Sequence, residues 1–215
     1  MPLILFDLDD TLLSGDTERE WAEHMLDLPL DIEEGFLEKL DSFTALYREG
    51  NLDINIYTSF LLKPIKNLRE EELKDLAFPF CERTFNKFKD QTTLELLNKH
   101  KKDTCLLVSG TLSFLVKEMA SLMGLDDSLG TPVEVENGIL TGKRGGPPNF
   151  SEEKVSRVRE WIKLDKGNYE EIYAYSDSIY DLPMLDYADH PAAVSPDRKL
   201  RKIANERGWE IIERS

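Results

Sequence analysis

The sequence predicts an α/β fold in which a doubly wound, mostly parallel sheet carries an inserted helical cap. Short apolar runs such as Leu3–Phe6 and Thr104–Val108 have the length and composition of buried parallel strands. Segments with apolar residues at helical spacing separate these runs, as crossover helices do in a parallel sheet. A charged stretch with helical periodicity, from about Thr17 to Phe88, interrupts the alternation. We therefore expect one α/β domain with a helical insert.

The first part of the chain contains one strand followed by the helical block. The strand Leu3–Phe6 ends at the string DLDDT, residues 7–11. Within the block, helical segments are expected over Trp21–Leu28, Phe36–Tyr47, Ile54–Leu62, and from Arg69 to Leu76 or beyond. We expect residues 16–88 to form the cap, and residues 1–15 together with 89–215 to form the core.

The rest of the chain alternates between strands and helices. The expected strands are Thr104–Val108, Glu171–Tyr175, Ala192–Val194 and Trp209–Ile212. The expected helices are Thr92–Lys101, Leu112–Met123, Glu152–Leu164, Asp181–Ala188 and Arg198–Glu206. The dipeptide Asn137-Gly138 lies between two extended runs, Pro132–Val135 and Ile139–Gly142. Because Asn-Gly between such runs favours a tight turn, we expect a β-hairpin there.

The charge balance excludes several classes of partner. The 215 residues include 27 basic and 42 acidic side chains, which gives a formal net charge of -15 and a pI near 4.7. Such an acidic surface repels nucleic-acid phosphates and anionic lipid heads, so we expect neither nucleic acid nor membrane as a partner. We find no apolar run long enough to span a bilayer, no signal-peptide pattern and only two cysteines. These features predict a cytoplasmic protein.

Polar side chains follow three of the expected strands at the point where each strand ends. Asp7 and Asp9 follow the first strand, Ser109 the second, and Asp177 the strand Glu171–Tyr175. Parallel strands present their carboxyl ends at the same edge of a sheet, where ligands bind. Alternate residues after a strand can point to the same side, so Asp7 and Asp9 are expected to approach one point that Asp177 also reaches. Oxygen ligands of this kind suit Mg²⁺.

Groups that bind anions are expected opposite these carboxylates. Ser109 and the Gly110 amide can donate hydrogen bonds, and Lys154, at the start of an expected helix, offers a positive charge. The nearby alternatives to this lysine are Lys143, Arg144 and Arg157. A metal, a hydroxyl, an amide and an ammonium around one point form a site for a tetrahedral phosphoryl group.

These strings, in this order, resemble the four motifs of the haloacid dehalogenase-like (HAD) hydrolases. The strings are DLDDT (7–11), VSGT (108–111), Lys154 and SDSIYDLP (176–183). Their order and spacing resemble subfamily IB, the phosphoserine-phosphatase-like branch, in which a helical cap follows the first motif. The resemblance covers Leu3–Ile212. It implies a Rossmann-like core and a Mg²⁺-dependent phosphatase that hydrolyses a small phosphorylated metabolite.

The resemblance also implies a role for each acidic motif residue. Asp7 is the expected nucleophile, which forms an aspartyl-phosphate. Asp9 is the expected general acid and base, which protonates the leaving oxygen and later takes a proton from water. The Asp7 side chain, the Asp9 main-chain carbonyl and Asp177 are the expected ligands of Mg²⁺.

The residues around the phosphate and the substrate follow from the same resemblance. Ser109, Gly110 and Lys154 are expected to hold the phosphoryl oxygens. Asp181 is expected to support the metal site without binding the metal directly. The alternative is that it caps the helix that follows it. Asp16 lies nine positions after the nucleophile, where phosphoserine phosphatases usually carry a glutamate that meets the substrate amino group.

Several alternatives stay open on the sequence alone. The fourth motif has Tyr180 where the branch usually has Asn, and Arg48 is a loose candidate for gripping a substrate carboxylate. Phosphoserine, histidinol phosphate and a sugar phosphate therefore fit equally well. A phosphotransferase, or a non-catalytic regulator that binds a phosphorylated ligand, is the alternative to a phosphatase. The helical block could also form a dimer surface, so a monomer and a homodimer are both compatible with the sequence.

Overall fold

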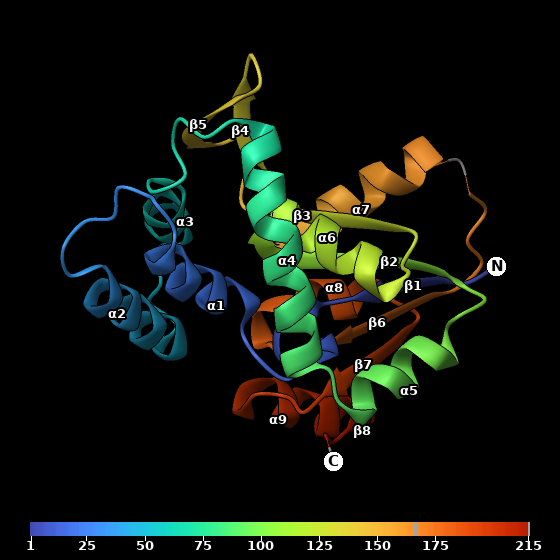
Figure 1. Ribbon diagram of the computed structural model, residues 1–215. Helices are drawn as coiled ribbons and strands as arrows, with labels where there is room; N and C mark the ends of the chain where they lie inside the picture. Colours follow the sequence, from blue (N-terminus) through green and yellow to red (C-terminus); the bar gives the residue numbers. More distant parts are fainter. Residues whose placement is uncertain (166, 215) are drawn as a thin grey trace.

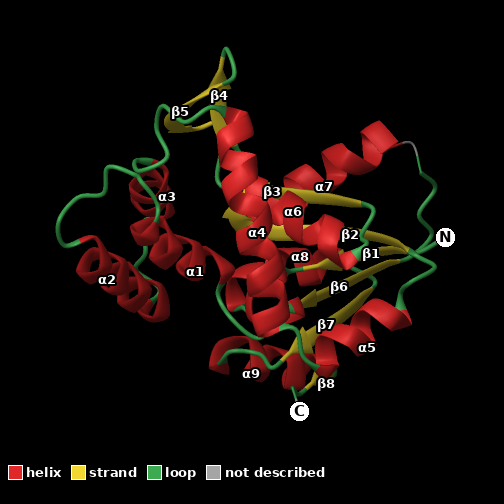
Figure 2. Cartoon of the chain, viewed as in Figure 1, coloured by secondary structure: helices red, strands yellow, loops and turns green. Residues whose placement is uncertain are grey.

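The computed structural model describes residues 1–165 and 167–214, without the side chain of Arg48. The described strands include a six-stranded parallel sheet in the order β3-β2-β1-β6-β7-β8 (Figures 1 and 2). These strands are β1 (Leu3–Phe6), β2 (Thr104–Leu112), β3 (Asp127–Thr131), β6 (Ile172–Ser176), β7 (His190–Val194) and β8 (Glu210–Ile212). The predicted α/β class is confirmed, and β1 lies inside the sheet between β2 and β6.

Helices cover both faces of the sheet. Helices α5 (Gln91–Lys99) and α6 (Ser113–Met123) pack on one face, and α7 (Glu152–Asp165), α8 (Leu182–Tyr187) and α9 (Arg198–Arg207) pack on the other. Side chains of β1 alternate between these faces, so that Ile4 and Phe6 belong to one hydrophobic core while Leu3 and Leu5 belong to the second. A strand buried on both faces is apolar throughout, which is why its sequence is a continuous apolar run.

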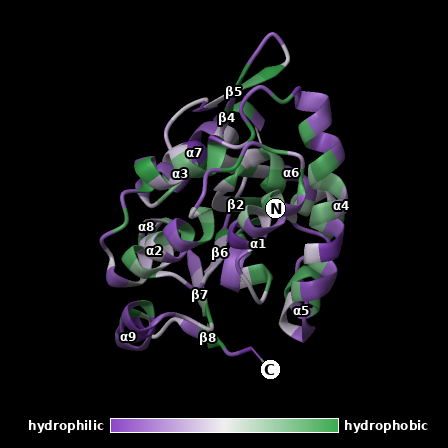
Figure 3. Cartoon of the chain, turned by 60° about the vertical axis from the view of Figure 1, so that its left-hand side comes forward, coloured by the Kyte–Doolittle hydropathy of each residue, from purple (hydrophilic) through white to green (hydrophobic). Residues whose placement is uncertain are grey.

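A block of helices lies between β1 and α5, as the sequence predicts. It consists of α1 (Thr17–His24), α2 (Phe36–Glu49), α3 (Ile54–Leu62) and α4 (Glu70–Phe88). Figure 1 shows α2 and α3 to one side of the sheet, and Figure 3 shows α4 in alternating purple and green segments. The buried Trp21 ring contacts Phe80 of α4 and Phe114 of α6 edge-on, with centroids 5.1 Å and 5.4 Å away. The block and the sheet therefore share one hydrophobic core, and the division at residues 16 and 88 stays a prediction.

The predicted hairpin is present as β4 (Val133–Glu136) and β5 (Ile139–Arg144). Its turn residues Asn137 and Gly138 have φ angles of 52° and 77°, as a two-residue turn of this type requires. The hairpin also pairs with the segment before α4. The Leu140 amide donates to the Leu68 carbonyl (2.8 Å), and the Leu140 carbonyl accepts from the Asn67 amide (2.9 Å). The hairpin is thereby joined to the helical block by main-chain hydrogen bonds.

Strand β3 at the edge of the sheet is not among the predicted elements. Its sequence, DSLGT, has no apolar run and no alternation of apolar and polar residues, so it carries no local signal for a strand. Gly130 allows β3 to lie against the start of α6, since a Cβ there would be 2.6 Å from the Ser113 Cα. Pairing with β3 also accompanies the extension of β2 to Leu112, beyond the predicted end at Val108.

Two smaller expectations can be compared with the structure. Cys81 and Cys105 are both buried and unpaired, and both lie in the hydrophobic core, as expected. None of the described helices combines the length and the apolar character needed to span a membrane. The cytoplasmic location stays a prediction.

Candidate active site

The carboxyl ends of β1, β2 and β6 border a cavity of about 180 Å³ that the helical block closes from the other side. The lining residues from the strand ends and the segments after them include Asp7, Asp9, Ser109, Gly110, Thr111, Asp177 and Asp181. The helical block contributes an apolar and aromatic wall, formed by Phe43, Tyr47, Leu52, Ile54 and Tyr57. The eight residues to which the sequence analysis assigns a catalytic, metal, phosphate or specificity role, including Lys154 and Asp16, all line this cavity.

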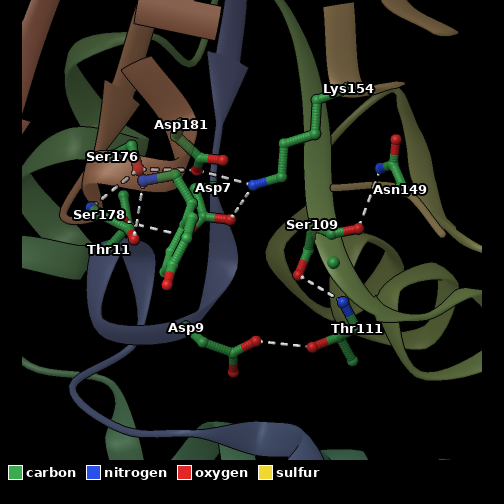
Figure 4. Close-up of polar contacts among 12 residues, drawn as sticks. Asp7, Asp9, Thr11, Ser109, Thr111, Asn149, Lys154, Ser176, Ser178 and Asp181 are labelled. Carbon is green, nitrogen blue, oxygen red and sulfur yellow. Dashed lines mark hydrogen bonds and ion pairs between the residues drawn. The ribbon is translucent and has the colours of Figure 1, made fainter. Parts of the chain in front are cut away.

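Asp7 and Asp181 share the ammonium group of Lys154 at the base of the cavity. The Lys154 Nζ lies 2.7 Å from Asp7 Oδ1 and 2.7 Å from Asp181 Oδ2, and all three side chains are buried (Figure 4). Burial raises the pKa of Asp7 to about 7, although Lys154 opposes the shift. Burial alone would lower the pKa of Lys154, but the charges of Asp181 and Asp7 outweigh it and the pKa lies above its ordinary value.

The hydroxyl of Thr11 joins Asp7 to Asp177. The Thr11 Oγ1 lies 3.1 Å from both Asp7 Oδ2 and Asp177 Oδ1, and it accepts a hydrogen bond from the Asp177 amide at 2.9 Å. Burial raises the pKa of Asp177 well above its ordinary value, and the negative charge of Asp7 adds to the effect. The two carboxylates are thus held close together with little positive charge between them.

The Asp9 carboxylate does not point to the place where Asp7 and Asp177 meet, contrary to the expectation from strand alternation. Its Oδ1 accepts from the main-chain amide and the hydroxyl of Thr17 (both 2.6 Å), and its Oδ2 accepts from the Thr111 hydroxyl (2.7 Å). Figure 4 shows the side chain turned toward Thr111. The reason is that strand alternation is interrupted at Leu8, where the helical turn Leu8–Leu12 begins, and the chain turns again at Asp10, which has a φ of 53°. Burial, supported by the Asp16 charge, raises the pKa of Asp9 to about 7.

Ser109 and Gly110 lie at the end of β2, where Asn149 fixes the main chain. The Asn149 amide group donates to the carbonyls of Ser109 (2.9 Å) and Leu129 (2.7 Å), and the Ser109 hydroxyl oxygen accepts from the Thr111 amide at 3.1 Å. Asn149 is fully buried and was not predicted as a site residue. Its only signal in the sequence is its place in the loop before the helix that carries Lys154.

The structure separates Lys154 from its alternatives. Lys143 and Arg144 lie in β5 and do not line the cavity, and Arg157 donates to the carbonyl of Gly130 at 2.8 Å. The capping alternative for Asp181 is wrong. Its side chain makes no capping bond to α8 and instead accepts from Lys154 and from the Ser176 hydroxyl, each at 2.7 Å.

Two acidic residues at the start of α1 reach the cavity. Asp16 caps the helix, because its Oδ1 accepts from the Arg19 amide at 2.8 Å. Glu18, which was not predicted, accepts from the Leu112 amide through Oε1 at 3.0 Å. Burial raises the pKa of Glu18 to about 8, and the charges of Asp16 and Asp9 add to the effect.

Aromatic side chains close the cavity between the block and the sheet. The Tyr180 ring packs on Tyr47 of α2 and on Phe150, with centroids 5.1 Å and 4.9 Å away. The Tyr47 hydroxyl forms a hydrogen bond with the Ser178 hydroxyl at 3.2 Å. Tyr180, at the position where the sequence departs from the motif, therefore connects the two parts of the protein. Arg48, the sequence candidate for a substrate carboxylate, has its side chain outside the described part of the structure.

Comparison with known proteins identifies the family. Residues 4–186 match the sequence model of the haloacid dehalogenase-like hydrolases. The chain belongs to this family. It is 30% identical to the histidinol-phosphatase of Neisseria meningitidis serogroup C, over 98% of this chain and 97% of that protein. It is 29% identical to the phosphoserine phosphatase of Lactococcus lactis, over 86% of this chain and 80% of that protein.

The structural comparison agrees with the family. A crystal structure from Bordetella pertussis Tohama I, of a protein with unknown function, superimposes with a TM-score of 0.89 at 30% identity. The match covers 98% of this chain and 97% of that one. The chain is thus a HAD-type phosphatase of the phosphoserine-phosphatase-like branch, as the sequence predicts.

The residues of this HAD site suit a Mg²⁺ ion. Among the residues described, no three His, Cys, Asp or Glu side chains are grouped as metal ligands. The ligand set that the family resemblance implies has only two carboxylates, from Asp7 and Asp177, and the main-chain carbonyl of Asp9. Asp7 and Asp177 are both within 3.1 Å of one hydroxyl, and the one ammonium at the base is shared by Asp7 and Asp181. A hard divalent cation with oxygen ligands would offset this excess negative charge.

Proposed function

We propose that the chain is a Mg²⁺-dependent phosphatase that hydrolyses a small phosphomonoester through an aspartyl-phosphate on Asp7. The observation that carries this proposal is the fixation of the Asp7 carboxylate at the base of the cavity, with Oδ1 bonded to Lys154 and Oδ2 to Thr11. A nucleophilic carboxylate has to be ionised and held in one orientation. The Lys154 ammonium favours the ionised form of Asp7 against the effect of burial, and the two contacts together fix its orientation. Family membership supports the same reaction.

The reaction proceeds in two steps. In the first, a carboxylate oxygen of Asp7 forms a bond to phosphorus while the bond to the ester oxygen breaks, and Asp9 donates a proton to the departing alcohol. In the second, water attacks the aspartyl-phosphate, Asp9 takes a proton from that water, and phosphate leaves as the Asp7 carboxylate is restored. Thr17 and Thr111 hold Asp9 in place through three hydrogen bonds, so the same carboxyl group is available for both steps.

The phosphoryl group is bound by groups at the base of the cavity. Ser109 and the Gly110 amide donate hydrogen bonds to its oxygens, and Lys154 offsets the negative charge that develops in the transition state. Asp181 keeps the Lys154 ammonium beside Asp7, and thus acts as a positioning residue. When bound by Asp7, Asp177 and the Asp9 carbonyl, Mg²⁺ supplies further charge stabilisation at the phosphoryl oxygens.

The helical block serves as the cap of the site. Its residues form the wall opposite the strand ends, and the Tyr47–Tyr180 contact closes the cavity at the boundary between block and sheet. Closure keeps bulk water away from the aspartyl-phosphate and strengthens the electrostatic contacts inside.

The proposal is tested by phosphate release with Mg²⁺ from a panel of phosphomonoesters, namely p-nitrophenyl phosphate, O-phosphoserine, histidinol phosphate and a sugar phosphate. We expect release by the wild type and none by Asp7→Asn, because the neutral amide cannot form the acyl phosphate. Asp186→Asn removes the same charge from an exposed ion pair with Arg207 and should keep full activity. Persistent turnover in Asp7→Asn, or wild-type release that does not depend on Mg²⁺, would contradict the mechanism.

A further inference from the structure

We propose that Arg214 is a positioning residue of the metal site, because it fixes the main chain of Thr11, whose hydroxyl joins the two metal-binding carboxylates. The proposal rests on the proposed function, since Asp7 and Asp177 are the carboxylates that would bind Mg²⁺. Arg214 follows β8, lies outside the four motifs and does not line the cavity. Its role follows from the bonds of Thr11, from the anchoring of its own side chain, and from the effect of such contacts on metal affinity.

Thr11 connects the metal site to contacts outside it. Its hydroxyl lies 3.1 Å from one carboxylate oxygen each of Asp7 and Asp177, and its main-chain carbonyl accepts a hydrogen bond from the Arg214 guanidinium. Thr11 is fully buried, and a β-branched side chain has few rotamers, so a displacement of its main chain moves the hydroxyl as well. The distance between the two carboxylates therefore depends on where the main chain of Thr11 is held.

Side chains from two other segments hold the turn at neighbouring carbonyls. Arg214 donates to the Thr11 carbonyl. The Thr93 hydroxyl of α5 donates to the next carbonyl, that of Leu12. Both donors are joined by Asp90, whose carboxylate accepts from the Thr93 amide at 2.9 Å and from the Arg214 guanidinium. The turn is thus tied to the start of α5 and to the chain that follows β8.

Arg214 is itself anchored. Its main-chain amide donates to the Ser195 hydroxyl at 2.9 Å, and its side chain is 15% exposed. Its Nη1 donates to Asp90 and its Nη2 to Thr11, and Figure 1 shows β8 beside α5, as these bonds require. A guanidinium presents its N–H groups in a fixed planar fork, so an anchored guanidinium sets the positions of both acceptors at once. An ammonium is a point charge without that geometry.

Contacts behind the metal ligands change metal affinity without touching the metal. Removing such a contact typically weakens metal binding by about 10- to 100-fold. Without Arg214, the buried Thr11 carbonyl loses a charged donor, so that the turn relaxes and the hydroxyl no longer holds both carboxylates. Ser109 and Lys154, which would bind the phosphoryl group, lie on other segments. We therefore expect weaker Mg²⁺ binding with little change in the KM of the substrate.

The test measures Mg²⁺ binding without turnover. Each variant is unfolded in urea with and without Mg²⁺, and the increase in the free energy of unfolding gives the dissociation constant for Mg²⁺, whatever the stability of the metal-free variant. We expect Arg214→Gln to raise this constant by roughly 10-fold, and to raise the Mg²⁺ concentration for half-maximal phosphate release by the same factor. The KM for p-nitrophenyl phosphate at saturating Mg²⁺ should stay near the wild-type value. Arg201→Gln makes the same change in an exposed pair with Glu213 and should keep the wild-type dissociation constant.

A second background tests whether the effect passes through Thr11. Thr11→Val removes the hydroxyl and keeps the carbonyl, so Arg214→Gln should raise the dissociation constant much less in that background. A wild-type constant in Arg214→Gln, or the full increase in the Thr11→Val background, overturns the proposal and leaves the phosphatase intact. A wild type that binds Mg²⁺ but releases no phosphate removes the proposed function alone. If Arg214→Gln does not fold, Arg214→Lys, which keeps the charge without the fork, replaces it, and a wild-type constant in that variant overturns the proposal.

Discussion

Replacing Lys154 by Met tests whether the base of the site depends on one buried ammonium. The side chain of Lys154 is 4% exposed, and its two partners, Asp181 and Asp7, are 4% and 9% exposed. Met keeps the length and apolar volume of the lysine stem, so the substitution removes the charge with little loss of packing. What remains is two buried carboxylates without a cation.

The expected cost follows from that geometry. Removing one partner of a buried ion pair lowers the free energy of unfolding by about 3–5 kcal/mol, because the remaining charge stays buried without compensation. Lys154 has two partners at 2.7 Å, so we expect a loss at the upper end, about 4–5 kcal/mol. In an Asp181→Asn background one of the two carboxylates is already neutral, and Lys154→Met should then cost about 2 kcal/mol less.

The assay is urea unfolding in EDTA at neutral pH, followed by tryptophan fluorescence, for the wild type, both single variants and the double variant. Lys143→Met, which removes an exposed charge in β5, is the control and should change stability by less than about 0.5 kcal/mol. A loss below about 1 kcal/mol in Lys154→Met would refute the reasoning. Strict additivity with Asp181→Asn would refute it as well, because residues in contact are expected to couple.

Three further predictions follow from other parts of the structure. Asp9→Asn should lower kcat on an alkyl phosphate by about 10²- to 10⁴-fold and should cost less on p-nitrophenyl phosphate, whose leaving group needs no proton; equal losses in steady-state assays would exclude Asp9 as the general acid. Burial lowers the pKa of His100 below 6.5 in the folded protein, so the unfolded chain takes up the proton first and stability falls as pH drops through that value. His100→Gln should therefore flatten the pH dependence of urea unfolding below about pH 6.5, by up to about 1.4 kcal/mol per unit, and an unchanged slope would contradict this role. Leu140→Ala, at a fully buried hairpin residue, should lower the free energy of unfolding by about 2–5 kcal/mol in the same assay, and a loss under about 1 kcal/mol would mean that the hairpin adds little to the shared core.

The sequence allowed the sheet and most of its helices to be predicted because their signals are local. The strand Leu3–Phe6 and the turn at Asn137-Gly138 can each be recognised from a few adjacent residues. Strand β3 has no such signal, because its polar residues become a strand only through pairing with β2. The attachment of the hairpin to the segment at Leu68 is likewise a contact between distant parts of the chain.

The candidate site shows the same limit. The rule that parallel strands end at one edge placed Asp7, Ser109 and Asp177 around one cavity. It could not give the direction of the Asp9 carboxylate, which is set by hydroxyl groups from α1 and β2 and by the turn that follows Asp7. Glu18 was missed for a related reason, because its partner Leu112 is 94 positions away in the chain.

The hairpin connects the helical block to the loop that leads to the base of the site. Its main chain is bonded to the segment from Asn67 to Glu70, so any rotation of the helical block that opens the cavity has to carry the hairpin with it or break those bonds. The chain that leaves the hairpin runs through the loop at residues 145–150, which places Phe150 against Tyr180, and then enters the helix that holds Lys154. The hairpin and the loop after it therefore form a continuous stretch of chain between the helical block and the helix that carries Lys154.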